Sequence, residues 1–269
     1  MPLSICITCG TQYPESVQPP AHCPICEDER QYVNPNGQQW TTLEELRPDH
    51  HITIETVEPN LSRLKPEPKV GIAQYAHLVQ TPNGNVLWDC VPFIDDATIE
   101  AINALGGISA IAISHPHFHT AMVEWSRAFN NAPIYIHEGN RTDVVRPDPV
   151  IQYWNGDSRL LMDGITLVHC GGHFLGSSVL HWQDGAEGRG VLLTSDTIDV
   201  VADMRYVTFM YSYPNLIPLP ASKIRRIIAA IESFAFDRVY ESFGGVVDGD
   251  AKAKVNASAD RYIRAITDS

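Results

Sequence analysis

The sequence predicts an α/β fold, because short apolar runs with the character of buried strands alternate with segments of helical periodicity. An isoleucine-rich run at 108–114 lies between a glycine pair and a Ser-His pair, which is typical of a strand buried on both faces. Thr120 is then a candidate helix N-cap, and apolar side chains recur at helical spacing as far as residue 129. A Pro-Asn-Gly turn at 82–84 predicts a hairpin.

The other predicted elements continue this alternation. We expect strands at 71–80, 85–89, 132–137, 164–169, 179–182, 191–194 and 238–241, and helices at 97–105, 221–234 and 251–267. The 269 residues have room for one large domain and a small appendage. We therefore expect residues 1–46 to form a first unit, residues 47–69 a proline-rich linker with one strand at 51–57, and residues 70–269 the main domain.

The net charge and the hydropathy of the sequence argue against nucleic-acid and membrane partners. The net charge of −13 and the pI near 5.2 argue against nucleic acid, whose phosphates require a basic surface. No stretch approaches the roughly 20 apolar residues of a membrane span. The N-terminus MPLSICITCG lacks the charged start and apolar run of a signal peptide. We expect a soluble, cytoplasmic protein with no nucleic-acid or membrane partner.

Two CxxC pairs mark the first unit. Cys6 and Cys9, with Cys23 and Cys26, have the spacing of a tetrahedral tetrathiolate site, whereas two disulfides fit an intracellular chain poorly. The segment resembles a rubredoxin-like zinc ribbon, so we expect a structural Zn²⁺; rubredoxins hold iron in the same ligand set, and the sequence leaves both metals open. The ribbon is acidic, which favours contact with a partner or homo-oligomerisation over nucleic-acid binding.

Five side chains predict a second metal site. His115, His117 and His119 alternate directly after the predicted strand, and in an extended chain alternate residues share a face. His173 stands in a glycine-rich turn that lets its imidazole reach a shared centre. Asp196 directly follows another apolar strand. Neutral imidazoles with a carboxylate bind zinc or iron well, so we expect a divalent metal here.

Residues 70–268 resemble the metallo-β-lactamase superfamily. Its first signature, H-x-H-x-D-H after a buried strand, is matched by residues 115–120. Its later Gly-His ligand is matched by Gly172-His173, and its bridging Asp by Ser195-Asp196-Thr197. The resemblance implies an αββα sandwich with the metal site at the edges of two facing sheets.

Departures from the family pattern concern a second metal. The resemblance implies that His115, His117 and His173 bind a first metal. The second metal's own ligands are replaced by His119, Thr120 and, in a short stretch of weak similarity, Phe243. We therefore expect a mononuclear site.

A metallo-hydrolase is the leading functional hypothesis. Zinc with three histidines and an open position lowers the pKa of its water to about 7, which makes a hydroxide nucleophile at neutral pH. Asp196 binds the metal or accepts the proton of the attacking water. His119 binds a weak second metal, shuttles protons, or hydrogen-bonds to a ligand. The expected substrate is a small ester, lactone, thioester or amide.

Two alternatives remain open at this point. Persulfide dioxygenases of the superfamily bind one iron through a set that corresponds to His115, His173 and Asp196, a 2-His-1-carboxylate triad. A rubredoxin-like unit would suit electron transfer, as in flavodiiron proteins, although their pattern needs more carboxylates. The other alternative is a catalytically degenerate binding module that keeps its metal and acts through the ribbon.

Overall fold

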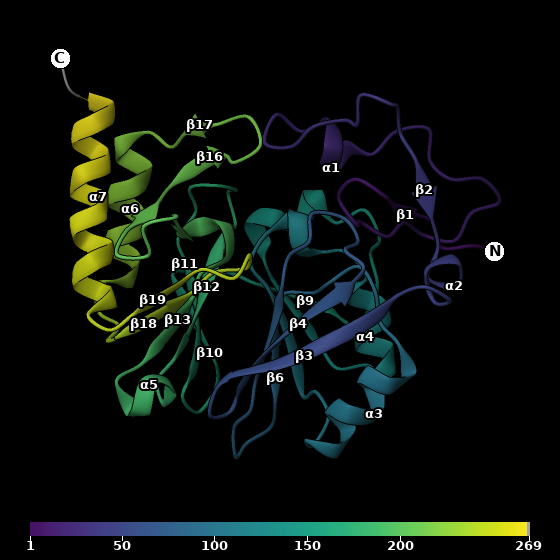
Figure 1. Cartoon of the computed structure of the whole chain (residues 1–269), viewed down its shortest axis with the longest axis horizontal. Coiled ribbons are helices and arrows are strands. Elements are labelled where there is room, and N and C mark those ends of the chain that lie inside the picture. Colours follow the sequence, from purple (N-terminus) through teal and green to yellow (C-terminus); the bar gives the residue numbers. More distant parts are fainter. Residues whose placement is uncertain (268–269) are drawn as a thin grey trace. The chain divides into compact units, whose positions relative to one another are not determined.

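The computed structural model describes residues 1–267, which form two compact units (Figure 1). The first unit combines residues 1–136 with residues 141–153. The second combines residues 137–140 with the chain from Trp154 onward. Within the described residues, no helix is long and apolar enough to cross a membrane.

A seven-stranded sheet forms the centre of the first unit, in the order β3-β4-β5-β6-β7-β8-β9. Its strands are β3 (His51–Glu58), β4 (Leu61–Glu67), β5 (Ala76–Val79), β6 (Val86–Trp88), β7 (Ala110–Ile113), β8 (Ile134–His137) and β9 (Ile151–Trp154). β6, β7 and β8 run parallel, whereas β3 to β6 pair as antiparallel neighbours. The predicted linker at 47–69 instead contributes the hairpin β3-β4 to this sheet, because its strands pair with each other and with β5.

Two helices, α3 (Asp96–Ala104) and α4 (Met122–Ala128), pack on this sheet. Asp95 caps α3 by accepting a hydrogen bond from Thr98 N at 2.7 Å. The same carboxylate accepts from Ile52 N of β3 at 2.8 Å, which fixes the hairpin against the helix. Trp125 of α4 is fully buried, and its indole N–H donates to the carbonyl of Val91 at 3.1 Å. These bonds join helices and sheet into one core.

The cysteine-rich segment packs into the first unit. It contains β1 (Ile5–Cys6), α1 (Pro24–Glu27), β2 (Trp40–Thr41) and α2 (Leu43–Leu46). β1 and β2 pair antiparallel, and Trp40 meets Tyr13 edge to face at 5.2 Å. Ile5 and Leu43 belong to the core that also holds α4. The segment therefore shares its apolar core with the sheet.

A six-stranded sheet forms the second unit, in the order β10-β11-β12-β13-β18-β19. Its strands are β10 (Ser158–Met162), β11 (Ile165–His169), β12 (Ser178–Trp182), β13 (Val191–Leu193), β18 (Arg238–Tyr240) and β19 (Val246–Asp248). Only the β13–β18 pair is parallel among the pairings of this sheet within residues 1–267. Short strands follow β13 along the chain: β14 (Asp199–Val200), β15 (Val207–Thr208), β16 (Met210–Ser212) and β17 (Ile217–Pro218).

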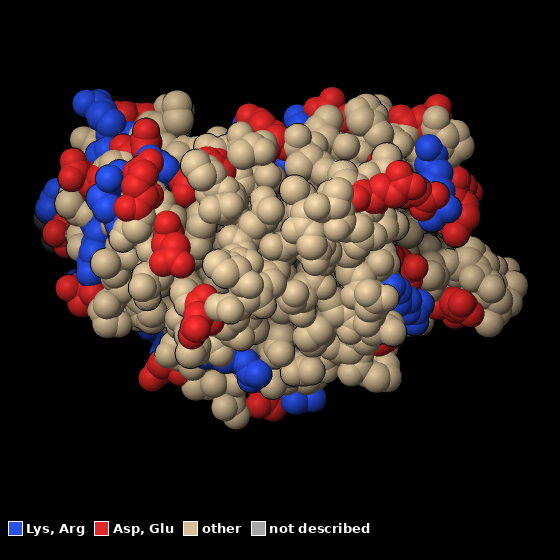
Figure 2. Space-filling model, turned by 90° about the horizontal axis from the view of Figure 1, so that it is seen from below, with Lys and Arg blue, Asp and Glu red and all other residues tan. Residues whose placement is uncertain are grey.

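Two helices, α6 (Ala221–Ile231) and α7 (Ala251–Thr267), lie side by side on this sheet, and α5 (Gly185–Gly188) is a short turn (Figure 1). α6 buries Ile224, Ile227 and Ile231, whose spacing places them on one helical stripe. On the face in Figure 2, acidic and basic side chains are interspersed over the end that carries α6 and α7. This pattern is typical of the solvated face of an amphipathic helix.

Candidate metal centres

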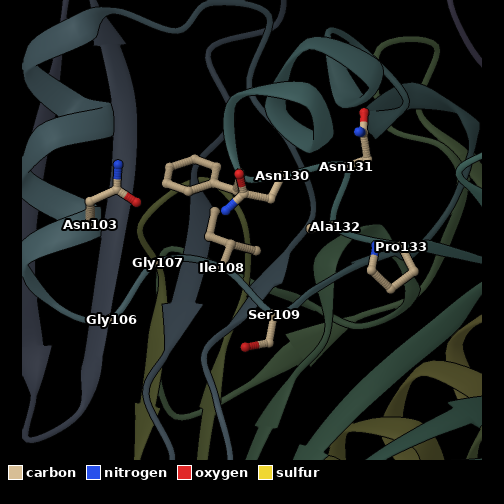
Figure 3. A pocket seen from close by; sticks show the side chains of 10 residues that line it. Asn103, Gly106, Gly107, Ile108, Ser109, Asn130, Asn131, Ala132 and Pro133 are labelled. Carbon is tan, nitrogen blue, oxygen red and sulfur yellow. The ribbon is translucent and has the colours of Figure 1, made fainter.

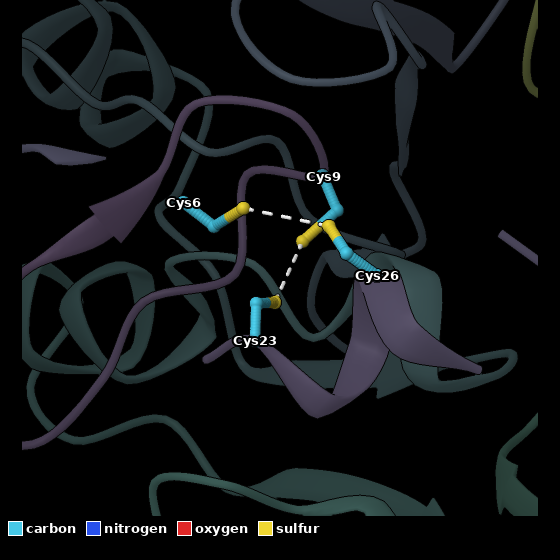
Figure 4. Close-up of side chains that lie close together, drawn as sticks. All are labelled: Cys6, Cys9, Cys23 and Cys26. Carbon is cyan, nitrogen blue, oxygen red and sulfur yellow. Dashed lines mark hydrogen bonds between the residues drawn. The ribbon is translucent and has the colours of Figure 1, made fainter. Parts of the chain in front are cut away.

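Four cysteine thiols converge between the two CxxC turns (Figure 4). The sulfurs of Cys6, Cys9, Cys23 and Cys26 all lie within 4.8 Å of one another. The Cys6–Cys26 and Cys9–Cys23 sulfur pairs are 3.5 and 3.6 Å apart. A tetrahedral ion with Zn–S bonds of about 2.3 Å would hold its sulfurs roughly 3.8 Å apart. All four thiols are free and buried, so this cluster fits a tetrathiolate metal site.

Neighbouring polar groups support the thiolate form of this cluster. The Tyr13 hydroxyl donates to Cys23 Sγ at 3.1 Å, and Gln38 Nε2 donates to Cys6 Sγ at 3.0 Å. Hydrogen bonds among the four thiols lower the pKa of Cys6 and Cys23 and raise that of Cys9 and Cys26, so without a metal the cluster shares its protons unevenly. Thiolates are the metal-binding form of cysteine, and donors of this kind stabilise them.

The predicted histidines follow β7, but the backbone between them is not extended. His115 has φ −165°, and residues Pro116–Phe118 then form a 3₁₀ turn with Pro116 at its first position. The imidazoles of His115 and His117 nevertheless lie together, with ring centroids 5.0 Å apart. The prediction that alternation in an extended chain aligns these side chains is therefore wrong. Proline favours the first position of a helical turn because its φ is already set for it.

Two residues that sequence reasoning missed hold His115 in place. Ser114 Oγ lies 2.8 Å from Nδ1 of His115, and this contact leaves Nε2 as the ring nitrogen for a metal. Ser114 N in turn donates to the carboxylate of Asp89 at 2.8 Å. Asp89 is fully buried directly after β6, a position where an acidic residue following an apolar strand could have signalled its role.

His119 is buried, and within the described part of the chain neither of its ring nitrogens has a hydrogen bond of standard geometry, although the main chain of Asp143 interacts with the ring. Burial lowers the pKa of its imidazole to about 3, so the ring is neutral at neutral pH. A buried imidazole without hydrogen bonds is costly unless another group, such as a metal ion, engages it. The next residue, Thr120, has φ +30° and is not the N-cap of α4, which is Ala121.

The second unit brings the two other predicted ligands together. His173 Nε2 lies 3.6 Å from Asp196 Oδ2, and both side chains are buried. His173 Nδ1 lies 3.2 Å from the carbonyl of Met210, the type of outer hydrogen bond that metal-binding histidines make. Gly172 has φ +88°, and a Cβ there would lie 2.9 Å from Ile227, so glycine allows the turn that presents His173. The pair fits a divalent metal in donor type and orientation.

A carboxyl pair near Asp196 was not predicted. Burial raises the pKa of Asp199, in β14, to about 8, and the charges of Glu241 and Asp196 act in the same direction. Glu241 follows β18 and accepts hydrogen bonds from the main-chain N–H groups of Phe243 and Gly245. Phe243 itself is 47% exposed. Its replacement of the family's last histidine ligand stays a prediction.

A cavity of about 520 Å³ opens in the first unit, at the start of β7 (Figure 3). Asn103, Ile108, Ser109 and Asn130 are among its lining residues. It lies at the opposite end of β7 from the histidines, and none of them lines it. The cavity is therefore separate from the candidate metal ligands.

Comparison with known proteins places these features in a known fold. No family model matches the sequence. YmaE, an uncharacterized protein of Bacillus subtilis strain 168, is 50% identical over 268 residues, which cover 99% of this chain and 97% of YmaE. The mono-zinc form of the metallo-β-lactamase FIM-1 from Pseudomonas aeruginosa matches with a TM-score of 0.58 at 14% identity, over 80% of this chain and 96% of its own.

A B3 metallo-β-lactamase with an active-site glutamic acid also matches, with a TM-score of 0.55 at 16% identity, over 79% of this chain and 88% of its own. These structural likenesses confirm the predicted fold class. The chain combines a metallo-β-lactamase fold with an N-terminal four-cysteine cluster that fits a zinc ribbon.

Proposed function

Because the chain belongs to the same family as YmaE and has the metallo-β-lactamase fold, we propose that it is a metal-dependent hydrolase. In this proposal His115, His117 and His173 share one metal ion, and Asp196 is either a further ligand of that ion or the proton acceptor next to it. The observation that carries it is the buried His173–Asp196 pair, with 3.6 Å between Nε2 and Oδ2. A buried imidazole held by an outer hydrogen bond, next to a buried carboxylate, forms the donor set expected for a catalytic divalent metal.

Each side chain has a separate task in the proposed reaction. When bound, a zinc ion supplies Lewis-acid chemistry and makes water nucleophilic at neutral pH. Asp196 either binds that ion or accepts the proton of the attacking water. The hydroxyl of Tyr213 donates to the main-chain carbonyl of Asp196 at 3.1 Å, which keeps the turn that carries the carboxylate in place. Neutral His119 can relay a proton or bind a second, weaker ion.

The proposed substrate is a small ester, lactone, thioester or amide, because an activated water attacks the carbonyl carbon of any of these groups. We propose zinc at this site and at the four-cysteine cluster. Both sets of donors accept it, the first through imidazole and carboxylate and the second through four thiolates.

An iron dioxygenase is the second candidate function. The same His173–Asp196 pair, together with His115, would make a 2-His-1-carboxylate triad, the ligand set that suits iron(II) with open positions. The identity of the metal separates the two candidates.

The test begins with metal content per chain, measured by elemental mass spectrometry on full-length protein purified without added metal. We expect about two zinc ions per chain, one for each cluster. His173→Ala should lose about one of them, and His173→Ala and Asp196→Asn should each lower hydrolysis of ester or lactone substrates by at least about 100-fold. His51→Ala, an exposed histidine on β3, is the matched control and should retain both ions and full activity.

Three results would contradict the hydrolase. Unchanged hydrolysis in the His173 and Asp196 variants would place catalysis elsewhere. One iron ion in place of the second zinc would favour the dioxygenase. Metal loss without any loss of biological activity would favour a binding module that acts through the ribbon.

A further inference from the structure

The first CxxC turn packs directly against the loop that carries the histidines. We call residues 6–12 the first knuckle and residues 114–120 the histidine loop. The main-chain N–H of Gln12 donates to the carbonyl of Thr120 at 3.2 Å. A Cβ placed on Gly10 would lie 3.6 Å from Cγ2 of Thr120 and 2.7 Å from the Pro92 ring. Gly10 of the knuckle is therefore next to the histidine loop, to which Gln12 is hydrogen-bonded.

Thr120 is the residue of the loop that most needs support. Its φ of +30° lies in the left-handed region, which a β-branched side chain rarely adopts. A residue in such a conformation stays there only when its surroundings hold it. Because Thr120 directly follows His119, its conformation decides where the loop leaves that histidine and enters α4.

A buried arginine links the knuckle to the same loop by a second route. Arg146 donates to the side-chain oxygen of Gln12 and, at 2.7 Å, to Oε1 of Glu124 on α4. Its exposed fraction is 8%, and Gln12 is also buried. Gln12 thus connects to both ends of the turn between His119 and α4, through its main chain to Thr120 and through its side chain to α4.

The position of Gln12 depends in turn on the four-cysteine cluster. Gly10 N donates to the Cys6 carbonyl at 2.8 Å, and Cys6 N donates to the Thr11 carbonyl at 3.0 Å, which closes the knuckle around its two cysteines. A metal bound to all four thiolates joins this turn to the second CxxC turn. Small tetrathiolate units generally obtain much of their folding free energy from the metal. We therefore expect the knuckle to be less well ordered in the metal-free protein than in the metal-loaded protein.

We propose that the four-cysteine site positions the histidine loop, so that metal at the four cysteines strengthens metal binding at the histidines. This inference rests on the proposed metal site and concerns its regulation. The route runs from the thiolates through Gln12 to Thr120 and, by way of Arg146, to α4. By thermodynamic linkage, metal at the histidines must strengthen metal binding at the cysteines by the same factor.

The test uses the full-length protein, stripped of metal and titrated with Co²⁺. Thiolate-to-cobalt charge-transfer absorption reports on the four-cysteine site, and the remaining bound cobalt reports on the histidine site. Gln12→Ala removes the oxygen that accepts from Arg146, and Gln39→Ala removes an exposed glutamine of the same segment as the control. Gln12→Glu keeps an acceptor for Arg146 and replaces an Nε2 that has no hydrogen bond to any described residue.

We expect Gln12→Ala to keep the full thiolate absorption at saturating cobalt and to weaken cobalt binding at the histidines at least about fivefold. Gln12→Glu and Gln39→Ala should bind cobalt there as the unmodified protein does. Equal affinity of the Gln12→Ala and Gln39→Ala variants would overturn the inference. If Gln12→Ala also loses the thiolate absorption, Arg146→Met decides, since it breaks the same link from outside the ribbon and must also weaken the histidine site.

Failure of the proposed function has a different signature. In that case the unmodified protein would bind only the cobalt that produces thiolate absorption, and His173→Ala would change nothing. If instead the unmodified protein binds the second cobalt and every Gln12 and Arg146 variant binds it equally well, the metal site stands and only the positioning role is refuted.

Discussion

Gly10→Ala probes the contact between the first knuckle and the rest of the first unit. A Cβ at this position would lie 2.7 Å from Cβ and 2.9 Å from Cγ of Pro92. Neither atom belongs to a flexible side chain, because the proline ring is fixed to its backbone. Gly10 also has φ +80°, which disfavours any residue with a Cβ. The variant must therefore move the knuckle away from Pro92.

Two effects lower the free energy of unfolding of the Gly10→Ala variant, and they add. Placing an L-residue in the left-handed conformation costs roughly 1–2 kcal/mol. Forcing an extra methyl group into a packed site costs typically about 1–3 kcal/mol more. Gly37→Ala is the matched control, because Gly37 has φ +88° in the same segment but nothing within 4 Å of its added Cβ. The control is therefore destabilised only by the left-handed backbone conformation.

The assay is urea denaturation of the metal-loaded, full-length variants, followed by tryptophan fluorescence and far-UV circular dichroism. We expect Gly10→Ala to be less stable than Gly37→Ala by about 1–3 kcal/mol. With a slope of about 3 kcal/mol per molar urea, this difference moves the midpoint by roughly 0.3–1 M. Coincident midpoints at equal slope would refute the packing of the knuckle on Pro92.

Three further predictions concern single side chains, namely Tyr13, Ser114 and Asp199. Tyr13→Phe removes the hydroxyl that donates to Cys23 Sγ at 3.1 Å and should weaken metal binding at the four cysteines about tenfold or more. Ser114→Ala removes the partner of His115 Nδ1 at 2.8 Å and should weaken the histidine site about 10–100-fold. Burial raises the pKa of Asp199 to about 8, so stability of the metal-free protein should fall between about pH 4 and pH 8, and Asp199→Asn should reduce that fall.

The sign of the pH effect follows from proton binding. Between the unfolded pKa of about 3.9 and the folded pKa of about 8, the native state keeps a proton that the unfolded chain releases. Stability therefore decreases as pH rises, by up to about 1.4 kcal/mol per pH unit. Urea midpoints at several pH values measure this decrease in stability, and an equal dependence on pH with and without Asp199 would contradict the assignment.

Competition with a chelator measures the metal affinities of the Tyr13→Phe and Ser114→Ala variants. Tyr32→Phe, which changes an exposed tyrosine of the ribbon, is the control for Tyr13→Phe.

The metal-binding residue types could be predicted from the sequence because their signals are local. Two CxxC spacings place four thiols in two tight turns, and the structure brings those sulfurs within 4.8 Å of one another. The apolar run before His115 and the helical periods of α6 and α7 likewise depend on neighbours a few residues away. Elements of this kind were predicted within a few residues of their observed bounds.

Interactions between distant residues had no such signal. The hairpin β3-β4 was expected as a linker because its prolines dominate the local pattern, whereas its place in the sheet comes from pairing with β5. The carboxyls of Asp199 and Glu241 influence each other across 42 positions of the chain, so no motif relates them. Only the folded chain shows that these groups are neighbours.

The amino-acid sequence by itself determined which side chains can bind metal and which segments form the strands and helices that carry them. The tertiary structure decided how the histidine loop bends, since Pro116 begins a 3₁₀ turn where alternation suggested an extended chain. It also decided that Gln12 of the ribbon meets Thr120 and, through Arg146, α4. The physical reason is that ligand chemistry belongs to single side chains, whereas a packing contact exists only when two remote surfaces fold against each other.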